Sequence, residues 1–140
     1  MIGCPLMCNF CPQTKLQRAY KDPVRVMTFD NFVKIVDKLD KNVLIIFSGF
    51  TEPWANSQCT DFVEYALVSG FNIAIYTTMF GMSSNDADKL KYLVETYSKQ
   101  IQNFWIHLPD ASGNMPGWKM SDDYAYAFDM FVKKMGINIM

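Results

Sequence analysis

Three cysteines near the start of the chain have the spacing of metal ligands. Cys4, Cys8 and Cys11 lie close together, whereas the fourth cysteine, Cys59, stands alone. Thiolates separated by three and then two residues can converge on one centre, because a short loop brings their sulfurs to the same side. This division favours a metal centre over two disulfide bonds, and we predict that Cys59 belongs to the core.

Three thiolates are one ligand fewer than a closed zinc site requires. The only histidine, His107, lies far along the sequence on a different predicted strand. A 4Fe-4S cluster held by three cysteines instead leaves one iron open to a substrate or cofactor. The spacing therefore favours such a cluster over a structural zinc site or simple reduced thiols.

The composition describes a folded chain without a strong charge. Of its 140 residues, 50% are hydrophobic and 19% are charged, which is typical of a single domain with a packed core. Lys and Arg total 13 against 14 Asp and Glu, and this net charge of −1 argues against nucleic-acid binding. The longest apolar run, 43–47, is too short to span a membrane. Since the N-terminus lacks the pattern of a secretory signal, we predict a cytoplasmic protein.

Four amphipathic helix patterns alternate with short apolar runs along the rest of the chain. The apolar spacing predicts strands over 43–47, 71–78 and 103–108, and 137–140 resembles the start of another. Strand starts recur about every 30 residues, the length of one βα unit. We therefore predict an α/β fold with a parallel sheet covered by helices on at least one face, either an open doubly wound sheet or part of a barrel. The predicted helices span 28–39, 57–70, 84–97 and 121–135, with Thr28, Ser57 and Ser121 as caps and Gly70 ending the second.

Several short motifs follow the cysteine loop and the predicted strand ends. Phe10 directly precedes the last cysteine of the loop, and Pro12, Arg18 and 27–29 come before the first predicted strand. Later motifs are Ser48-Gly49-Phe50-Thr51-Glu52-Pro53, Tyr76-Thr77-Thr78 and His107-Leu108-Pro109-Asp110. With the cysteine spacing, these residues resemble the radical S-adenosylmethionine (radical SAM) superfamily, particularly members that carry a SPASM domain. The later motifs resemble the family's Gly-Gly-Glu-Pro and Thr-Asn-Gly motifs and a strand end that contacts ribose.

The resemblance implies a cofactor and a reaction. A reduced 4Fe-4S cluster on the three cysteines would cleave S-adenosylmethionine (SAM) to methionine and a 5′-deoxyadenosyl radical, which abstracts hydrogen from a substrate. The expected partners are an external electron donor and an unknown small-molecule or peptide substrate. The implied cofactor-binding residues are Phe10, Ser48, Gly49, Glu52, Pro53, Thr77, Thr78, His107 and Asp110, with Glu52 receiving the ammonium group of SAM.

The residues alone leave other roles open for part of this set. An acidic residue before proline, such as Glu52, is often only a turn residue. Polar side chains at strand ends are often no more than satisfied hydrogen-bonding groups, and that applies to Thr77, Thr78, His107 and Asp110.

The resemblance also implies an incomplete barrel. The family fold has six βα units with the cysteine loop after the first strand, whereas here a cluster loop over 1–26 precedes βα units over 27–140. We therefore expect a single truncated domain, 1–140, that keeps the cluster but cleaves SAM poorly. The alternative is a non-catalytic iron–sulfur or zinc-binding fragment that needs a second chain to complete the barrel, because an open parallel sheet has exposed edges.

Overall fold

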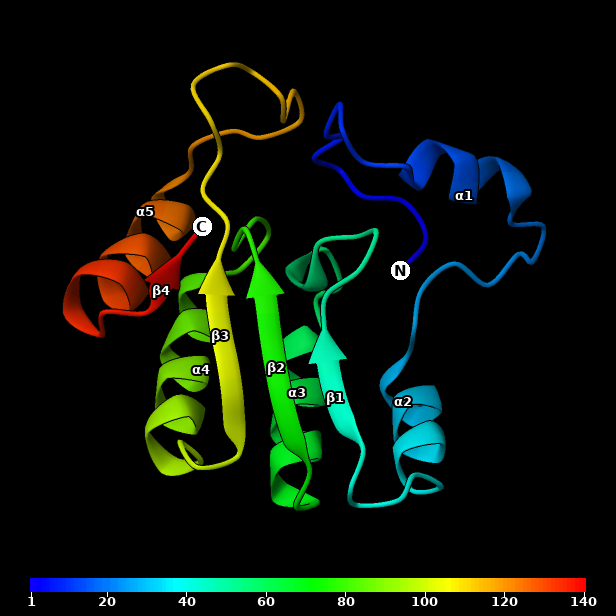
Figure 1. Cartoon of the computed structure of the whole chain (residues 1–140), viewed down its shortest axis with the longest axis vertical. Coiled ribbons are helices and arrows are strands. Elements are labelled where there is room, and N and C mark those ends of the chain that lie inside the picture. The colour runs from blue at the N-terminus through cyan, green and yellow to red at the C-terminus, as the bar shows by residue number, and fades with distance from the viewer.

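The computed structural model describes residues 1–140 and contains one parallel sheet. Its strands are β1 (Leu44–Phe47), β2 (Asn72–Thr77), β3 (Ile101–Ile106) and the short β4 (Asn138–Ile139), in that order across the sheet. Every neighbouring pair of strands is parallel. The sheet does not close, and β1 and β4 form its edges (Figure 1). The predicted α/β class and the strand at the end of the chain are confirmed.

Helices connect the strands and pack on one face of the sheet. They are α2 (Phe29–Val36), α3 (Cys59–Val68), α4 (Ser84–Thr96) and α5 (Asp122–Phe128), which continues as a π-helical segment, Asp129–Lys134. Figure 1 shows α3 and α4 behind the strands, on the same side of the sheet. Because the strands follow in chain order with their helices on one side, the sheet is part of a (βα) barrel and not a doubly wound sheet. None of the helices is long and apolar enough to cross a membrane.

Most helix boundaries follow the predicted capping residues. The Thr28 side chain accepts the backbone N–H of Asn31 at 3.3 Å, and Ser121 caps α5 in the same way. Gly70 has a φ of 84° directly after α3, as expected of a helix-ending glycine. The predicted Ser57 cap is wrong, because α3 begins at Cys59 behind Gln58, which makes no side-chain cap.

One helix was not expected from the pattern. α1 (Gln13–Ala19) lies within the region predicted as the cluster loop. Its only buried residue is Gln13, so no apolar stripe marks this helix in the sequence. Helix-favouring residues such as Gln, Lys, Leu, Arg and Ala make up most of the segment, which explains why it is helical.

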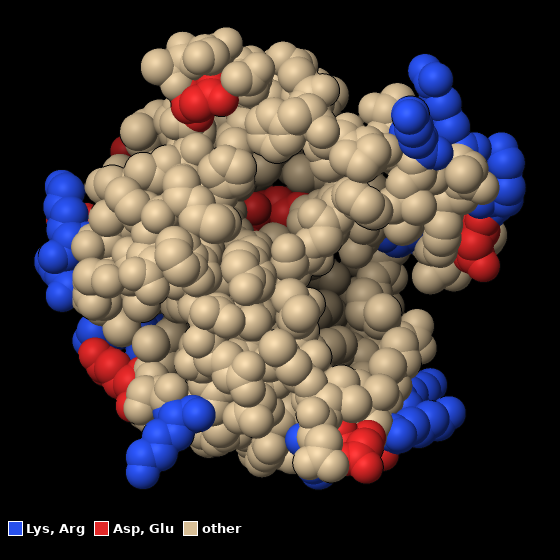
Figure 2. Space-filling model, viewed as in Figure 1, with Lys and Arg blue, Asp and Glu red and all other residues tan.

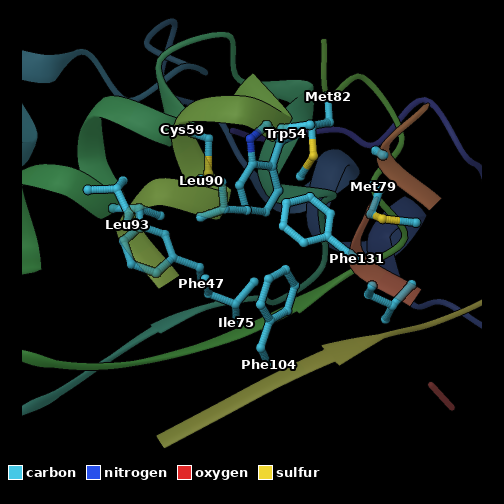
Figure 3. Close-up of a cluster of buried hydrophobic side chains, with 14 of the residues drawn as sticks. Phe47, Trp54, Cys59, Ile75, Met79, Met82, Leu90, Leu93, Phe104 and Phe131 are labelled. Carbon is cyan, nitrogen blue, oxygen red and sulfur yellow. The ribbon is translucent and has the colours of Figure 1, made fainter. Parts of the chain in front are cut away.

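The core fills the space between the sheet and its helices. Figure 3 shows side chains from the strands, including Phe47, Ile75 and Phe104, pointing toward Leu90, Leu93 and Phe131 on the helical side. Cys59 lies in this cluster with 2% of its surface exposed, which confirms its predicted place in the core. Burial raises the pKa of the Cys59 thiol well above its usual range, so the group stays neutral.

Candidate functional site

The cysteine loop lies over the carboxyl ends of the strands and forms a cavity there. The cavity has a volume of about 280 Å³. Figure 2, in the view of Figure 1, shows a hollow near the centre of the molecule, with acidic atoms inside it and Lys and Arg at the periphery. Ten predicted site residues line the cavity: Cys4, Cys8, Phe10, Cys11, Ser48, Gly49, Glu52, Thr77, Thr78 and His107.

Two predicted residues are not brought to the cavity wall. Pro53 is the first residue of a short 3-10 helix, Pro53–Ala55, and Asp110 lies in the loop that follows β3. The cavity also has lining residues outside the predicted set of site residues, although Phe50, Thr51 and Tyr76 belong to the motifs that supplied that set. Gln13 and Met115 are buried at 3% and 5% exposure, and the others are Leu6, Phe50, Thr51, Tyr76 and Met140.

Hydrogen bonds within the chain hold the cysteine loop at its start and in its second half. The Cys4 N–H donates to Gln13 Oε1 at 2.7 Å, so the buried amide at the start of α1 fixes the first cysteine. The Cys11 N–H donates to the carbonyl of Cys8 at 3.1 Å, which turns the second half of the loop. Met7 has a φ of 50°, a left-handed conformation that reverses the chain between the first two cysteines.

The three thiols are neighbours at the cavity, and all are free and partly buried. The pKa of the Cys8 thiol is raised, first by burial and then by the nearby Cys4 and Cys11. Three thiolates gathered in this way repel one another, and a bound cation would relieve that repulsion. The His, Cys, Asp and Glu side chains form no group of three or more already close enough to hold a metal ion.

The Glu52 carboxylate is the acidic group of the cavity. Glu52 is 4% exposed, and its two oxygens accept four hydrogen bonds from the chain. Oε2 accepts the Thr78 N–H and the Thr78 hydroxyl, each at 2.8 Å. Oε1 accepts the Thr77 hydroxyl and, at the long distance of 3.5 Å, the N–H of Trp54. The glutamate therefore joins the end of β1 to the end of β2.

Burial decides the protonation of this carboxyl. The pKa of Glu52 is raised because removal from water disfavours the charged form, although the bonds from Thr77, Thr78 and Trp54 act in the opposite direction. A cationic donor in the cavity would add a favourable charge interaction and so favour the ionised form. The weak Trp54 contact leaves one lone pair of Oε1 poorly used, so the carboxylate retains capacity for such a donor.

The two threonines at the end of β2, Thr77 and Thr78, have partners within the chain. Thr77 Oγ1 accepts the Met79 N–H at 2.8 Å while its hydroxyl donates to Glu52. Thr78 Oγ1 similarly accepts the Phe80 N–H at 3.3 Å. Both residues therefore hold the glutamate in place and shape the turn that follows the strand.

An aromatic pair spans the cavity between the cysteine loop and β3. The rings of Phe10 and His107 are stacked, with centroids 6.2 Å apart and an interplanar angle of 25°. The backbone N–H of His107 donates to the carbonyl of Thr77 at 2.8 Å, and this bond fixes the backbone that carries the imidazole. Phe10 is 62% exposed, so its ring remains accessible to a planar ligand.

Asp110 is engaged within its own loop. Its carboxylate accepts the Ser112 N–H at 3.0 Å, the Asn114 N–H at 3.2 Å and the Asn114 side-chain amide at 2.8 Å. These bonds lower the pKa of Asp110, with the Asn114 side chain as the largest cause. Asp110 thus shapes the segment after β3, and its predicted contact with a cofactor stays a prediction.

Comparison with known proteins supports part of this description. The model of the radical SAM superfamily matches residues 1–103. The match includes the cysteine loop, Glu52, Thr77 and Thr78 and ends before His107 and Asp110. No curated protein and no solved structure matches the chain. The resemblance to members with a SPASM domain stays a prediction.

Proposed function

The chain belongs to the radical SAM superfamily, and we propose that it is an enzyme that binds a 4Fe-4S cluster and SAM in the cavity at the strand ends. One observation carries the proposal. The thiols of Cys4, Cys8 and Cys11 line the same cavity as the buried carboxyl of Glu52. A soft ligand set and a group that can bind a cationic amine therefore face the same cavity.

The donor set fits the cluster. Thiolates are the usual ligands of iron–sulfur clusters, and three of them leave one iron of a cubane free for another ligand. All three come from one loop. Its start is held by Gln13, which accepts the Cys4 N–H, and by the Thr51 hydroxyl, which donates to the carbonyl of Gly3 at 3.0 Å. No Lys or Arg lines the cavity, so no cation of the chain competes for the thiolates.

When bound, the cluster supplies the electron for cleaving the sulfonium of SAM to methionine and a 5′-deoxyadenosyl radical that takes hydrogen from the substrate. The residues of the chain bind SAM and orient it. Glu52 accepts a hydrogen bond from the amino group of SAM. Thr77 and Thr78 hold the Glu52 carboxylate in position. Phe10 and His107 present flat surfaces for the nucleoside part, and Ser48 and Gly49 form the wall beside Glu52.

The proposal includes partners and a compartment. An external one-electron donor reduces the cluster, and the substrate is an unidentified small molecule or peptide. The four free thiols fit a reducing compartment, and we place the protein in the cytoplasm.

The open sheet favours a second candidate function. Both edge strands, β1 and β4, have an unpaired side, and such edges can accept a strand from another chain. In this candidate the chain is a non-catalytic iron–sulfur or zinc-binding fragment that a second chain completes. Mass measurement in solution, with and without co-expression of the protein from a neighbouring reading frame, distinguishes this candidate from a protein that acts alone.

The formation of 5′-deoxyadenosine tests the enzymatic proposal. After anaerobic reconstitution and reduction with dithionite, we expect the chain to release 5′-deoxyadenosine from SAM, measured by liquid chromatography. Because the cofactor must be held at the open iron for cleavage, Cys8→Ala should lower the rate at least about a hundredfold. Equal product in the wild type and in Cys8→Ala would contradict the proposal.

A further inference from the structure

A segment after β3 packs directly on the cysteine loop. We call residues 110–118 the strap. Figure 1 shows the chain between β3 and α5 extending beyond the strand ends, on the same side of the sheet as the N-terminal loop. The strap lies outside residues 1–103, which match the family model, so its contacts are a separate feature of this chain.

The strap makes one backbone hydrogen bond to each interval between the cysteines. The Gly117 N–H donates to the carbonyl of Leu6 at 3.0 Å, and Leu6 lies between Cys4 and Cys8. The Asn9 N–H donates to the carbonyl of Asn114 at 2.9 Å, and Asn9 lies between Cys8 and Cys11. Both stretches of chain between the cysteines are therefore hydrogen-bonded to the strap.

Gly117 allows this close approach. A Cβ atom at this position would overlap the Pro5 carbonyl oxygen and lie 2.8 Å from the Pro5 carbonyl carbon. It would also lie 3.0 Å from the Cα atom of Leu6. These are backbone atoms, so no side-chain rotation can relieve the overlap, and any larger residue must push the strap and the loop apart.

The strap has its own internal support. Asp110 accepts three hydrogen bonds from Ser112 and Asn114, which closes the first half of the strap into a compact turn. The Trp118 N–H donates to the Met115 carbonyl at 2.9 Å across Pro116 and Gly117, a β-turn with proline in its favoured position. Met115 is buried and reaches the cavity that the thiols line. The strap is thus a preformed element that can restrain the loop.

We propose that the strap sets the spacing of the three cysteine thiolates, with Gly117 as the positioning residue that makes its contact with the loop possible. The inference rests on the proposed function, because the group that the thiolates hold is the 4Fe-4S cluster. A restrained loop keeps its ligands together and slows the loss of metal. The strap acts through the loop and not by contact with the cluster.

The first test needs no cluster. In the cluster-free chain we expect Gly117→Ala to speed hydrogen–deuterium exchange of the Asn9 amide about tenfold, because its bond to Asn114 is broken, while amides of β2 keep their rates. Gly136→Ala is the matched control. Gly136 lies outside the strap, after the π-helical segment, with a φ of 66° and nothing within 4 Å of the added Cβ, so this change introduces backbone strain away from both the strap and the loop. Asp110→Ala, which loosens the strap without adding an atom, should act in the same direction as Gly117→Ala.

The second test uses the reconstituted chain. Gly117→Ala should lose iron to a chelator about tenfold faster than the wild type and show a changed EPR spectrum of the reduced cluster, whereas Gly136→Ala should match the wild type in both. Unchanged Asn9 exchange in Gly117→Ala, or iron loss equal in Gly117→Ala and Gly136→Ala, would overturn the proposal. Absence of iron uptake by the wild type would instead overturn the proposed function, and the exchange result would still decide whether the strap restrains the loop.

Discussion

Replacing Cys8 by alanine is expected to abolish incorporation of the iron–sulfur cluster. Cys8 is the central ligand of the predicted set, and the remaining Cys4 and Cys11 can hold only two of the four irons of a cubane. Cys4→Ala and Cys11→Ala should have the same effect. The measurement is iron per chain and visible absorbance after anaerobic reconstitution, which should fall from about four irons in the wild type to near zero in each variant.

Cys59→Ala is the matched control for these substitutions. Its thiol is 2% exposed in the hydrophobic core and is kept neutral by burial, so it is not available as a ligand. We expect full iron content in this variant, with a modest loss of stability from the missing sulfur. Iron loss in Cys59→Ala as complete as in Cys8→Ala would show that general destabilisation, and not ligand removal, explains the result.

Substitution of Glu52 should have the second largest effect, both on the free energy of unfolding and on SAM binding. Glu52→Ala leaves the N–H groups of Trp54 and Thr78 without their acceptor, and we expect a loss of about 3 kcal/mol in the free energy of unfolding, measured in urea. Glu52→Gln keeps the shape and removes the charge. It should weaken SAM binding roughly tenfold to a hundredfold, since a charge-assisted hydrogen bond contributes about 1.5 to 3 kcal/mol.

The control for Glu52 is a glutamate on the surface. Glu95→Gln breaks only an exposed ion pair with Lys91 on α4, which should change the free energy of unfolding by less than about 0.5 kcal/mol and leave SAM binding intact. If Glu52→Gln bound SAM as tightly as Glu95→Gln, with equal cluster content, Glu52 would be reassigned to a purely structural role at the turn.

The pH dependence of stability adds a signature of the buried carboxyl. Burial raises the pKa of Glu52 in the folded chain above its ordinary 4.5, so the folded state binds this proton more tightly than the unfolded state. The resulting stability is present below pH 4.5 and is lost as the pH rises through the raised pKa. Glu52→Gln has no such proton, so its free energy of unfolding should improve relative to the wild type between pH 4.5 and neutrality.

The fold was predictable wherever packing imposes a period on the sequence. Leu90 and Leu93 recur at helical spacing because α4 must bury one face, and Ile73, Ala74 and Ile75 form a continuous apolar run because β2 is buried on both faces. The helix α1 has no such signal, since its single buried residue is the polar Gln13. The start of β3 at Ile101 likewise depends on pairing with Ile73 across a register irregularity, which no local pattern encodes.

The candidate site was predictable as far as strand ends converge. The carboxyl ends of parallel strands meet at one edge, so Glu52 after β1 and Thr77 at the end of β2 had to come close together. The position of a residue in the sequence does not reveal the hydrogen-bond partners of its side chain. Asp110 follows a strand end, yet its carboxylate accepts hydrogen bonds from its own loop. The support of the cysteine loop was also hidden, because the contact of Gly117 with Pro5 joins distant parts of the chain through backbone atoms.

The EPR spectrum of the reduced, reconstituted chain with and without SAM is the most direct test of the central claim, which is that three thiolates leave an iron open beside Glu52. We expect about four irons and four sulfides per chain and a spectrum that changes when SAM binds at the open iron. The change should need far more SAM in Glu52→Gln. Stoichiometric zinc without iron uptake, or a four-iron cluster whose spectrum saturating SAM leaves unaltered, would contradict it.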